Sequence, residues 1–144
     1  MIALAKPAVI DTNIVVAGLI SASKDSPVVI ITEGMMSGRF PFLLSMNLID
    51  EYRRALNYPK VARLHALSGS EIESILIGII RQGIVRDPQS GEYAIADQKD
   101  WFLFDLLRAV DGTVLVTGDQ LLHREAPGWA STLSPAKFCQ LNGF

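Results

Sequence analysis

Cysteine and histidine are scarce in this sequence. The 144 residues include one cysteine, Cys139, and two histidines, His65 and His123. A single cysteine excludes an internal disulfide bond and a zinc site built from cysteines, so we expect Cys139 to be a buried, unreactive thiol. The two histidines are far apart and belong to unrelated segments. No histidine pair therefore favours zinc, and we expect surface or structural roles for both.

Long hydrophobic runs are also absent. Although 49% of the residues are hydrophobic, the charge-free stretches are interrupted by Gly, Ser or Pro well before the ~20 apolar residues that span a bilayer. The N-terminal sequence "MIALAKPAV" carries one lysine and no cleavage site after an apolar core, unlike a secretory signal. We therefore expect a cytoplasmic protein that makes no membrane contact. The length fits one compact domain over residues 1–144.

The chain has little net charge, −2 at pH 7. By itself this argues against a polyanionic ligand, but acids reserved for metal ions would make the remaining balance positive. Residues 39–63 carry more basic than acidic side chains. The acids are Asp50 and Glu51, and the bases are Arg39, Arg53, Arg54, Lys60 and Arg63. A phosphate backbone could use this excess, and the alternative is an ordinary solvated helix face.

Short apolar segments alternate with segments of helical periodicity. Strands are predicted over residues 8–10, 40–45, 84–86, 113–116 and 131–133. Helices are predicted over residues 13–20, 27–37, 46–57, 68–83, 100–110 and 134–142, with Ser26, Pro27 and Gly38 bounding the second and Ser70 with Glu73 capping the fourth. Strands separated by helices indicate a three-layer α/β fold around a mainly parallel sheet of four to five short strands.

Two predicted strands end in an acid. Asp11 follows the strand 8–10, and Asp119 follows "VLV" after a turn at Gly118. In an open parallel sheet, groups just beyond the carboxyl ends of the strands face a common crevice where ligands bind. Each acid alone is also explained by turn formation or helix capping, which Asp performs well.

Helices supply two further acids. On a helical wheel of residues 46–57, Glu51 lies just outside the apolar arc, whereas Asp50 lies opposite it in solvent. Asp100 begins its own helix, where the helix dipole alone would favour an acid. If Asp11, Glu51, Asp100 and Asp119 converge on one crevice, they repel one another unless a cation joins them. Carboxylate ligands favour Mg²⁺ or Mn²⁺ as that cation.

The chain resembles the PIN-domain family, in the branch of VapC-like toxins of toxin-antitoxin systems. "VIDTNIVVAGLIS" is similar to the first motif of that branch, "FPFLLSMNLIDEYRRALNYPKV" to the second, "DQKDWFLFDLL" to the third and "VLVTGDQLL" to the fourth. "LSPAKF" is similar to its usual C-terminal ending. The resemblance spans nearly the whole chain and implies a PIN-like, Rossmann-like fold. The metal-binding acids of the family fall on Asp11, Glu51, Asp100 and Asp119, and its supporting polar positions fall on Asn13 and Thr117.

The resemblance implies a Mg²⁺- or Mn²⁺-dependent endoribonuclease, because a bound divalent ion activates water and stabilises charge on the phosphate. It also implies a cognate antitoxin protein and a homodimer, for which "WFLFDLL" and "VVIITEGMM" offer apolar surface. Arg54 is the first candidate for contact with a flanking phosphate, and Arg53 and Arg39 are weaker ones. We expect Asp105 to pair with Arg108 at helical spacing or to act as a supplementary ligand.

Two departures from the branch leave other functions open. The segment "TGDQLL" lacks the second Asp that is common in the fourth motif, and Lys99 precedes Asp100 where two successive acids are usual. The alternative function is therefore a PIN-like module that binds nucleic acid or protein with little or no turnover. A phosphatase or phosphotransferase with Asp11 as its nucleophile ranks third, because those enzymes typically carry a second Asp where this chain has Asn13.

Overall fold

Parallel strands form the centre of the fold in the computed structural model, which describes residues 6–95 and 97–144. The strands are β1 (Ala8–Ile10), β2 (Leu43–Leu44), β3 (Ile84–Val85), β4 (Val114–Val116) and β5 (Ser131–Leu133). One parallel sheet has the order β1-β4-β5, and β2 pairs in parallel with β3. A parallel bridge between Ala8 and Phe42 joins the two sheets. The predicted α/β fold with a mainly parallel sheet is confirmed.

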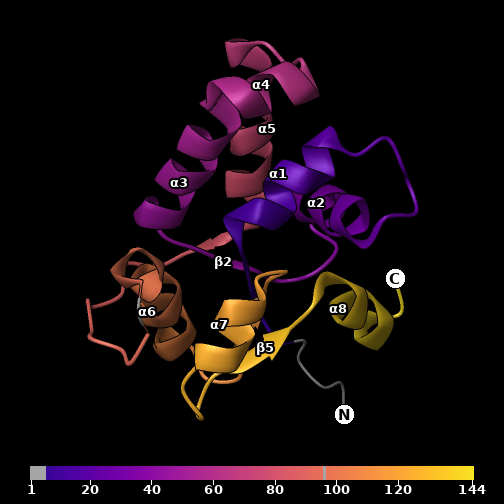
Figure 1. Cartoon of the computed structure of the whole chain (residues 1–144). Helices are drawn as coiled ribbons and strands as arrows, with labels where there is room; N and C mark the ends of the chain where they lie inside the picture. The colour runs from indigo at the N-terminus through magenta and orange to yellow at the C-terminus, as the bar shows by residue number, and fades with distance from the viewer. Residues whose placement is uncertain (1–5, 96) are drawn as a thin grey trace.

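Helices connect the strands throughout the described residues. They are α1 (Thr12–Ile20), α2 (Pro27–Ser37), α3 (Met46–Asn57), α4 (Pro59–His65), α5 (Gly69–Gln82), α6 (Trp101–Ala109), α7 (Gln120–Glu125) and α8 (Pro135–Asn142), with a 3₁₀ turn η1 (Gln98–Asp100) before α6. In Figure 1, α1 to α5 gather in the upper part of the molecule, whereas α6, α7 and α8 lie in the lower part around β5. The arrangement is consistent with an α/β/α architecture.

Local signals correctly located both ends of α2, and α3 has a cap that had not been predicted. Ser26 and Pro27 open α2, and Gly38 closes it in the left-handed conformation at a φ of 70°. The Ser45 hydroxyl accepts a hydrogen bond from the Leu48 amide and caps α3. These boundaries matter for function because α3 carries one of the four candidate acids.

Other local predictions were wrong or incomplete. The capping box of α5 uses Ser68 and Glu71, not Ser70 and Glu73, because the helix begins two residues earlier than that pair requires. The strand predicted over 40–45 is reduced to the two residues of β2. The helices α4 and α7 were not predicted. Pro59 ends α3 and also occupies the first position of α4, where its fixed φ suits a helix start.

The core takes up most of the apolar surface that had suggested a dimer interface. In α6, Leu103, Phe104, Leu106 and Leu107 are buried, and the α2 segment buries Val29, Ile31 and Met35. The exposed large hydrophobic residues in the described part of the chain lie elsewhere, at Met46, Tyr58, Leu64, Ile77, Val85, Leu121, Trp129 and Leu141. The two segments named for dimerisation therefore give much of their apolar surface to the core, whereas Met36 and Phe102 are half-buried.

Cys139 is buried, as predicted, and burial raises the pKa of its thiol, which keeps it protonated. Within the described residues, none of the helices combines the length and apolar character that a membrane span requires. The expectation about a secretory signal falls largely on residues 1–5, which lie outside the described residues.

The close packing of α1 on α2 generates a stability prediction. A Cβ atom on Gly18 would lie 2.1 Å from the Thr32 hydroxyl oxygen and 2.6 Å from the Val28 carbonyl oxygen, whereas a Cβ on Gly78 in α5 would meet nothing within 4 Å. We expect Gly18→Ala to lower the free energy of unfolding by about 1–3 kcal/mol through overpacking. Gly78→Ala should raise it by about 0.5–1 kcal/mol through helix propensity. Urea denaturation checks both, and equal effects of the two substitutions would contradict the close approach.

Candidate metal centre

The carboxyl ends of β1 and β4 place two acids side by side. Ile10 pairs with Val116 in the parallel register, and the Asp11 amide donates to the Val116 carbonyl at 3.0 Å. The next residue along β4 is Thr117, whose hydroxyl donates to Asp11 Oδ2 at 2.7 Å. The same hydroxyl oxygen accepts a hydrogen bond from the Asp119 amide at 3.0 Å. Thr117 thus links the two acids that follow neighbouring strands.

Asp119 also has the structural role that its position suggested. It is the N-cap of α7, and its Oδ1 atom accepts a hydrogen bond from the Leu121 amide at 2.9 Å. Capping uses one carboxylate oxygen, which leaves the other oxygen without a hydrogen bond to the described residues. Capping and cation binding are therefore compatible at this residue.

Glu51 is brought to the same edge by α3. Its neighbour Tyr52 is fully buried and donates its hydroxyl hydrogen to the Ile10 carbonyl oxygen at 2.6 Å. Ile10 directly precedes Asp11, so this bond ties the two acid-bearing segments together. Burial, followed by the charges of Asp11 and Glu51, raises the pKa of Tyr52 well above its ordinary value, so the hydroxyl remains a donor. As predicted from the helical wheel, Glu51 is half-buried and Asp50 is exposed.

Asp100 approaches from the start of α6, a helix that packs against β1 and β4. Burial raises the pKa of Asp100 to about 6, with further increases from the charges of Asp11, Asp97, Glu51 and Asp119. Carboxylates raise the pKa of a neighbour only when they lie close enough to repel it. All four acids predicted from the sequence therefore share one electrostatic environment.

Two other acids in the cluster have raised pKa values. Burial raises the pKa of Asp11 most, the Thr117 hydroxyl and the Thr12 amide lower it, and the charge of Asp119 raises it. For Glu51, burial raises the pKa, the Thr12 hydroxyl lowers it, the Asp11 charge raises it, and the Arg54 charge lowers it. The net pKa shift is upward for both groups. Without a cation, the negative charges of Asp11 and Glu51 therefore destabilise the folded protein.

The donor set fits a hard divalent cation. Its members are oxygen ligands that repel one another. The adjacent Thr12 hydroxyl is buried, and although it lies near enough to Glu51 to lower the pKa of that acid, it forms no hydrogen bond of regular geometry in the described structure. Within residues 6–95 and 97–144, however, no group of three or more His, Cys, Asp or Glu side chains already has the spacing to hold one ion. The acids are thus neighbours, but they are not arranged as a finished coordination shell.

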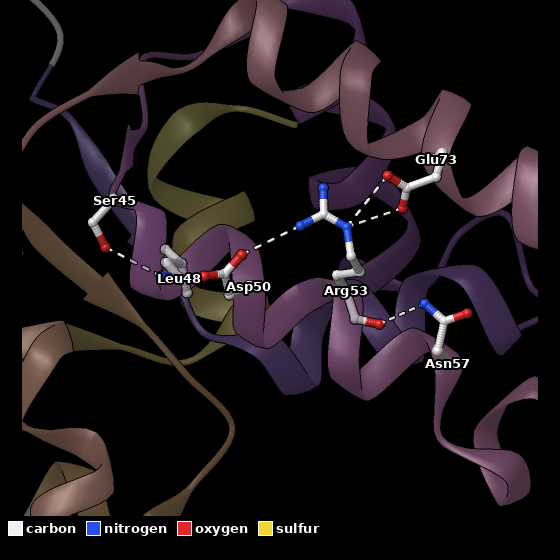
Figure 2. Close-up of polar contacts among 6 residues, drawn as sticks. All are labelled: Ser45, Leu48, Asp50, Arg53, Asn57 and Glu73. Carbon is white, nitrogen blue, oxygen red and sulfur yellow. Dashed lines mark hydrogen bonds and ion pairs between the residues drawn. The ribbon is translucent and has the colours of Figure 1, made fainter.

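The candidate basic residues differ in whether their side chains already contact other groups of the protein. Figure 2 shows Arg53 between two acids, 3.3 Å from Asp50 and 3.0 Å from Glu73, where it ties α3 to α5. Arg39 stacks its guanidinium over the Phe144 ring, with 4.3 Å between the guanidinium carbon and the ring centroid. Arg54 is exposed and close enough to Glu51 to lower its pKa. Arg54 is therefore the best-placed of the three for a phosphate near the acids.

The remaining sequence candidates lie outside the acid cluster or at its edge. Asn13 is exposed on the first turn of α1, and no hydrogen bond from its side chain occurs among the described residues. Asp105 is buried, and its Oδ1 atom accepts hydrogen bonds from the Gly91 amide and the Tyr93 hydroxyl, with Arg108 at 3.8 Å. Asp105 therefore holds the segment before Asp97 against α6, and the expected helical pair with Arg108 is confirmed.

Both histidines make structural hydrogen bonds, as expected. His65 Nε2 lies 2.8 Å from the Leu56 carbonyl oxygen, and its Nδ1 accepts from the Leu67 amide. His123 Nε2 lies 2.8 Å from the Thr117 carbonyl oxygen, and its Nδ1 lies 2.8 Å from the Thr132 hydroxyl. The neutral tautomer with hydrogen on Nε2 satisfies both rings. His123 therefore supports the residue that positions Asp11.

Sequence reasoning missed three contributors to the site: Thr12, Tyr52 and Asp97. Thr12 is adjacent to Asp11, and a small hydroxyl residue at the start of a helix was a usable signal. Asp97 lies three residues before Asp100, and its charge helps to raise the pKa of Asp100. Tyr52 lies within the apolar arc of the helix 46–57, and nothing in the local pattern indicates that its hydroxyl reaches Ile10, 42 positions away.

The hydroxyl of Tyr52 generates a stability prediction. Tyr52→Phe keeps the ring but removes the hydrogen bond to the Ile10 carbonyl, so we expect the free energy of unfolding to fall by about 1–2 kcal/mol. Tyr58→Phe is the matched control, because the Tyr58 side chain is exposed and makes no hydrogen bond with the described residues. Urea denaturation measures both variants, and an unchanged Tyr52→Phe stability would show that the buried bond contributes nothing.

The raised pKa of Asp100 generates a pH prediction for the protein in chelator. Between the ordinary value of 3.8 and about 6, the folded state binds more protons at this group than the unfolded state does. Stability is therefore lost as pH rises through that window. We expect Asp100→Asn to be more stable than the parent chain at about pH 7.5, by about 1 kcal/mol after discounting solvent screening. The difference should disappear near the ordinary carboxyl pKa.

Asp25→Asn is the control for this comparison, because Asp25 is an exposed acid outside the cluster. Denaturation of the three proteins at several pH values gives the required free energies. A variant at Asp100 that is less stable than the parent at every pH would contradict the repulsion inferred for this carboxylate.

Comparison with known families identifies one family. The PIN domain model matches residues 7–121, a range that includes all four acids and Thr117. A search of curated proteins gave no match. PIN domains are generally nucleases, and they typically use divalent metal ions. Because the match covers well over half of the sequence, this chain belongs to the PIN-domain family.

Proposed function

We propose that this chain is a Mg²⁺- or Mn²⁺-dependent endoribonuclease, a single PIN domain over residues 1–144 that acts in the cytoplasm as the toxin of a toxin-antitoxin pair. The observation that carries the proposal is the shared electrostatic environment of Asp11, Glu51, Asp100 and Asp119 at the carboxyl edge of the sheet. Four mutually repelling carboxylates suit a divalent cation. Family membership supports hydrolysis of nucleic acid.

In this proposal each acid has a distinct position. Asp11 is the central ligand, because it is the most buried of the four and is fixed by the Thr117 hydroxyl. Glu51 and Asp100 complete a first metal position, and Asp119 supports a second one with the oxygen not used for capping. A bound divalent cation would lower the pKa of a water and offset the charge that builds on the phosphate. Arg54 would hold a phosphate at the rim beside Glu51.

The toxin role rests on the resemblance to VapC-like sequences. It implies that a cognate antitoxin covers the acid edge and that two copies of the chain associate. The two apolar segments first considered for dimerisation contribute much of their surface to the core, and a homodimer would also use exposed residues such as Met46 or Leu141. A monomeric mass by light scattering would contradict the homodimer. An adjacent reading frame without a small DNA-binding protein with a charged tail would contradict the antitoxin.

A cleavage assay tests the proposed chemistry. Purified protein is incubated with single-stranded and structured RNA, with and without Mn²⁺, beside Asp11→Asn and the control Asp25→Asn. We expect Mn²⁺-dependent internal cleavage by the parent chain and by Asp25→Asn. Asp11→Asn should lose at least about 100-fold of the rate, because it removes a charged ligand that helps to fix the cation. Chelator should abolish cleavage by all three proteins.

The alternative is a PIN-like module that binds nucleic acid or protein without turnover. It is favoured by the absence, within the described residues, of acids already spaced to hold an ion. In the same assay, binding of RNA without any cleavage in Mn²⁺ would support the module and overturn the nuclease. A thermal shift by Mn²⁺ that Asp11→Asn abolishes would still show that the acids bind metal.

A further inference from the structure

A groove of about 650 Å³ opens directly beside the acid cluster. One wall is the exposed side of α3 and the corner that follows it, and the opposite wall comes from η1 and the start of α6. The lining residues are Asn47, Asp50, Glu51, Arg54, Ala55, Tyr58, Lys99 and Phe102. Glu51 belongs both to the groove and to the acid cluster, so the groove leads away from the proposed reaction centre.

Each wall of the groove carries an exposed cation. Arg54 and Lys99 are both exposed, and neither forms an ion pair within 4 Å in the part of the chain that the structure describes. Arg53 differs, because Figure 2 shows it held between Asp50 and Glu73. The ion pair between Arg53 and Asp50 also offsets the charge of Asp50, which lines the groove. The groove therefore presents two positively charged side chains to an anionic ligand that extends from the acid cluster into the groove.

The groove also carries aromatic surface. Tyr58 has 57% of its surface exposed, which is unusual for a large aromatic residue, and Phe102 is half-buried on the opposite wall. The Tyr58 amide donates to the Ala55 carbonyl at 3.3 Å, and its carbonyl accepts from the Ala62 amide at 2.8 Å. The residue after Tyr58 is Pro59, which is the first residue of α4. The backbone that carries the Tyr58 ring is thus fixed by hydrogen bonds of both its amide and its carbonyl group.

We propose that this groove binds one unpaired nucleotide of the substrate next to the phosphate that is cut, a proposal that rests on the nuclease function above. The base stacks on Tyr58 or Phe102, and the flanking phosphate lies between Arg54 and Lys99. A stacked base must have a free face, which a base inside a duplex does not offer to a side chain. The groove therefore selects single-stranded RNA.

Binding of a labelled oligonucleotide tests the groove separately from catalysis. A fluorescein-labelled ten-residue oligouridylate is titrated with protein in Ca²⁺, and a gel verifies that the strand stays intact. The same strand annealed to its complement serves as the duplex. We expect the parent chain to bind the single strand more tightly than the duplex, by at least about tenfold. Tyr58→Ala should weaken single-strand binding by about 5- to 100-fold, the range found for loss of one stacked base.

Two further variants make the result specific. Tyr58→Phe keeps the ring and should bind within about twofold of the parent chain. Leu64→Ala removes an equally exposed apolar side chain, 65% exposed on α4 and outside the groove, and should also leave binding unchanged. Arg54→Gln should weaken binding and lower the slope of log affinity against log salt by about 0.7, the value for one phosphate contact on a single strand.

The experiments distinguish an incorrect groove proposal from an incorrect nuclease proposal. If RNA is cleaved in Mn²⁺ but Tyr58→Ala binds like the parent chain, or if duplex binds as well as single strand, the groove proposal is overturned and the nuclease stands. If the single strand binds with the expected dependence on Tyr58 but is never cleaved, the groove stands and the nuclease is wrong. If Tyr58→Ala changes only the oligomeric mass, the groove is a protein contact and the proposal is overturned.

Discussion

The parallel pairing of β1 with β4 is the constraint on which the acid cluster depends. Once Ile10 lies opposite Val116, the residues that follow them must also be neighbours, and these are Asp11 and Thr117. The hydroxyl of Thr117 then holds Asp11 and receives the amide of Asp119. A change in register between these two strands would separate the acids.

Much of the fold and site was predictable because the signals are local or periodic. Apolar segments that end in Asp located the edge of the sheet, and helical spacing correctly placed Glu51 at the border of core and solvent. The turn at Gly38 was identified because a left-handed backbone favours glycine. The four acids could be selected from fifteen acidic residues because three of them follow a strand or begin a helix, and Glu51 lies at the edge of an apolar helix face.

The remaining features depend on contacts between distant segments. Arg53 was a reasonable phosphate ligand from its place beside Glu51, but its partner Glu73 lies 20 positions away on another helix. The apolar segments of α2 and α6 seemed too hydrophobic for one buried face, yet other elements cover them on most sides. Ser70 matched the spacing of a capping box as well as Ser68 did, and only the actual helix start separates the two.

The hydrogen bonds that hold the cluster together come from neutral groups. Thr117 donates to Asp11, and Tyr52 fixes the backbone just before it, but neither contributes a positive charge. A lysine at either position would relieve the repulsion and would also occupy the space of a cation. Instead, two cations that form no ion pair with the described residues, Arg54 and Lys99, lie at the rim. This separation leaves the interior of the cluster to a metal ion and the rim to the phosphates of a bound strand, so one arrangement of charge accounts for both proposed sites.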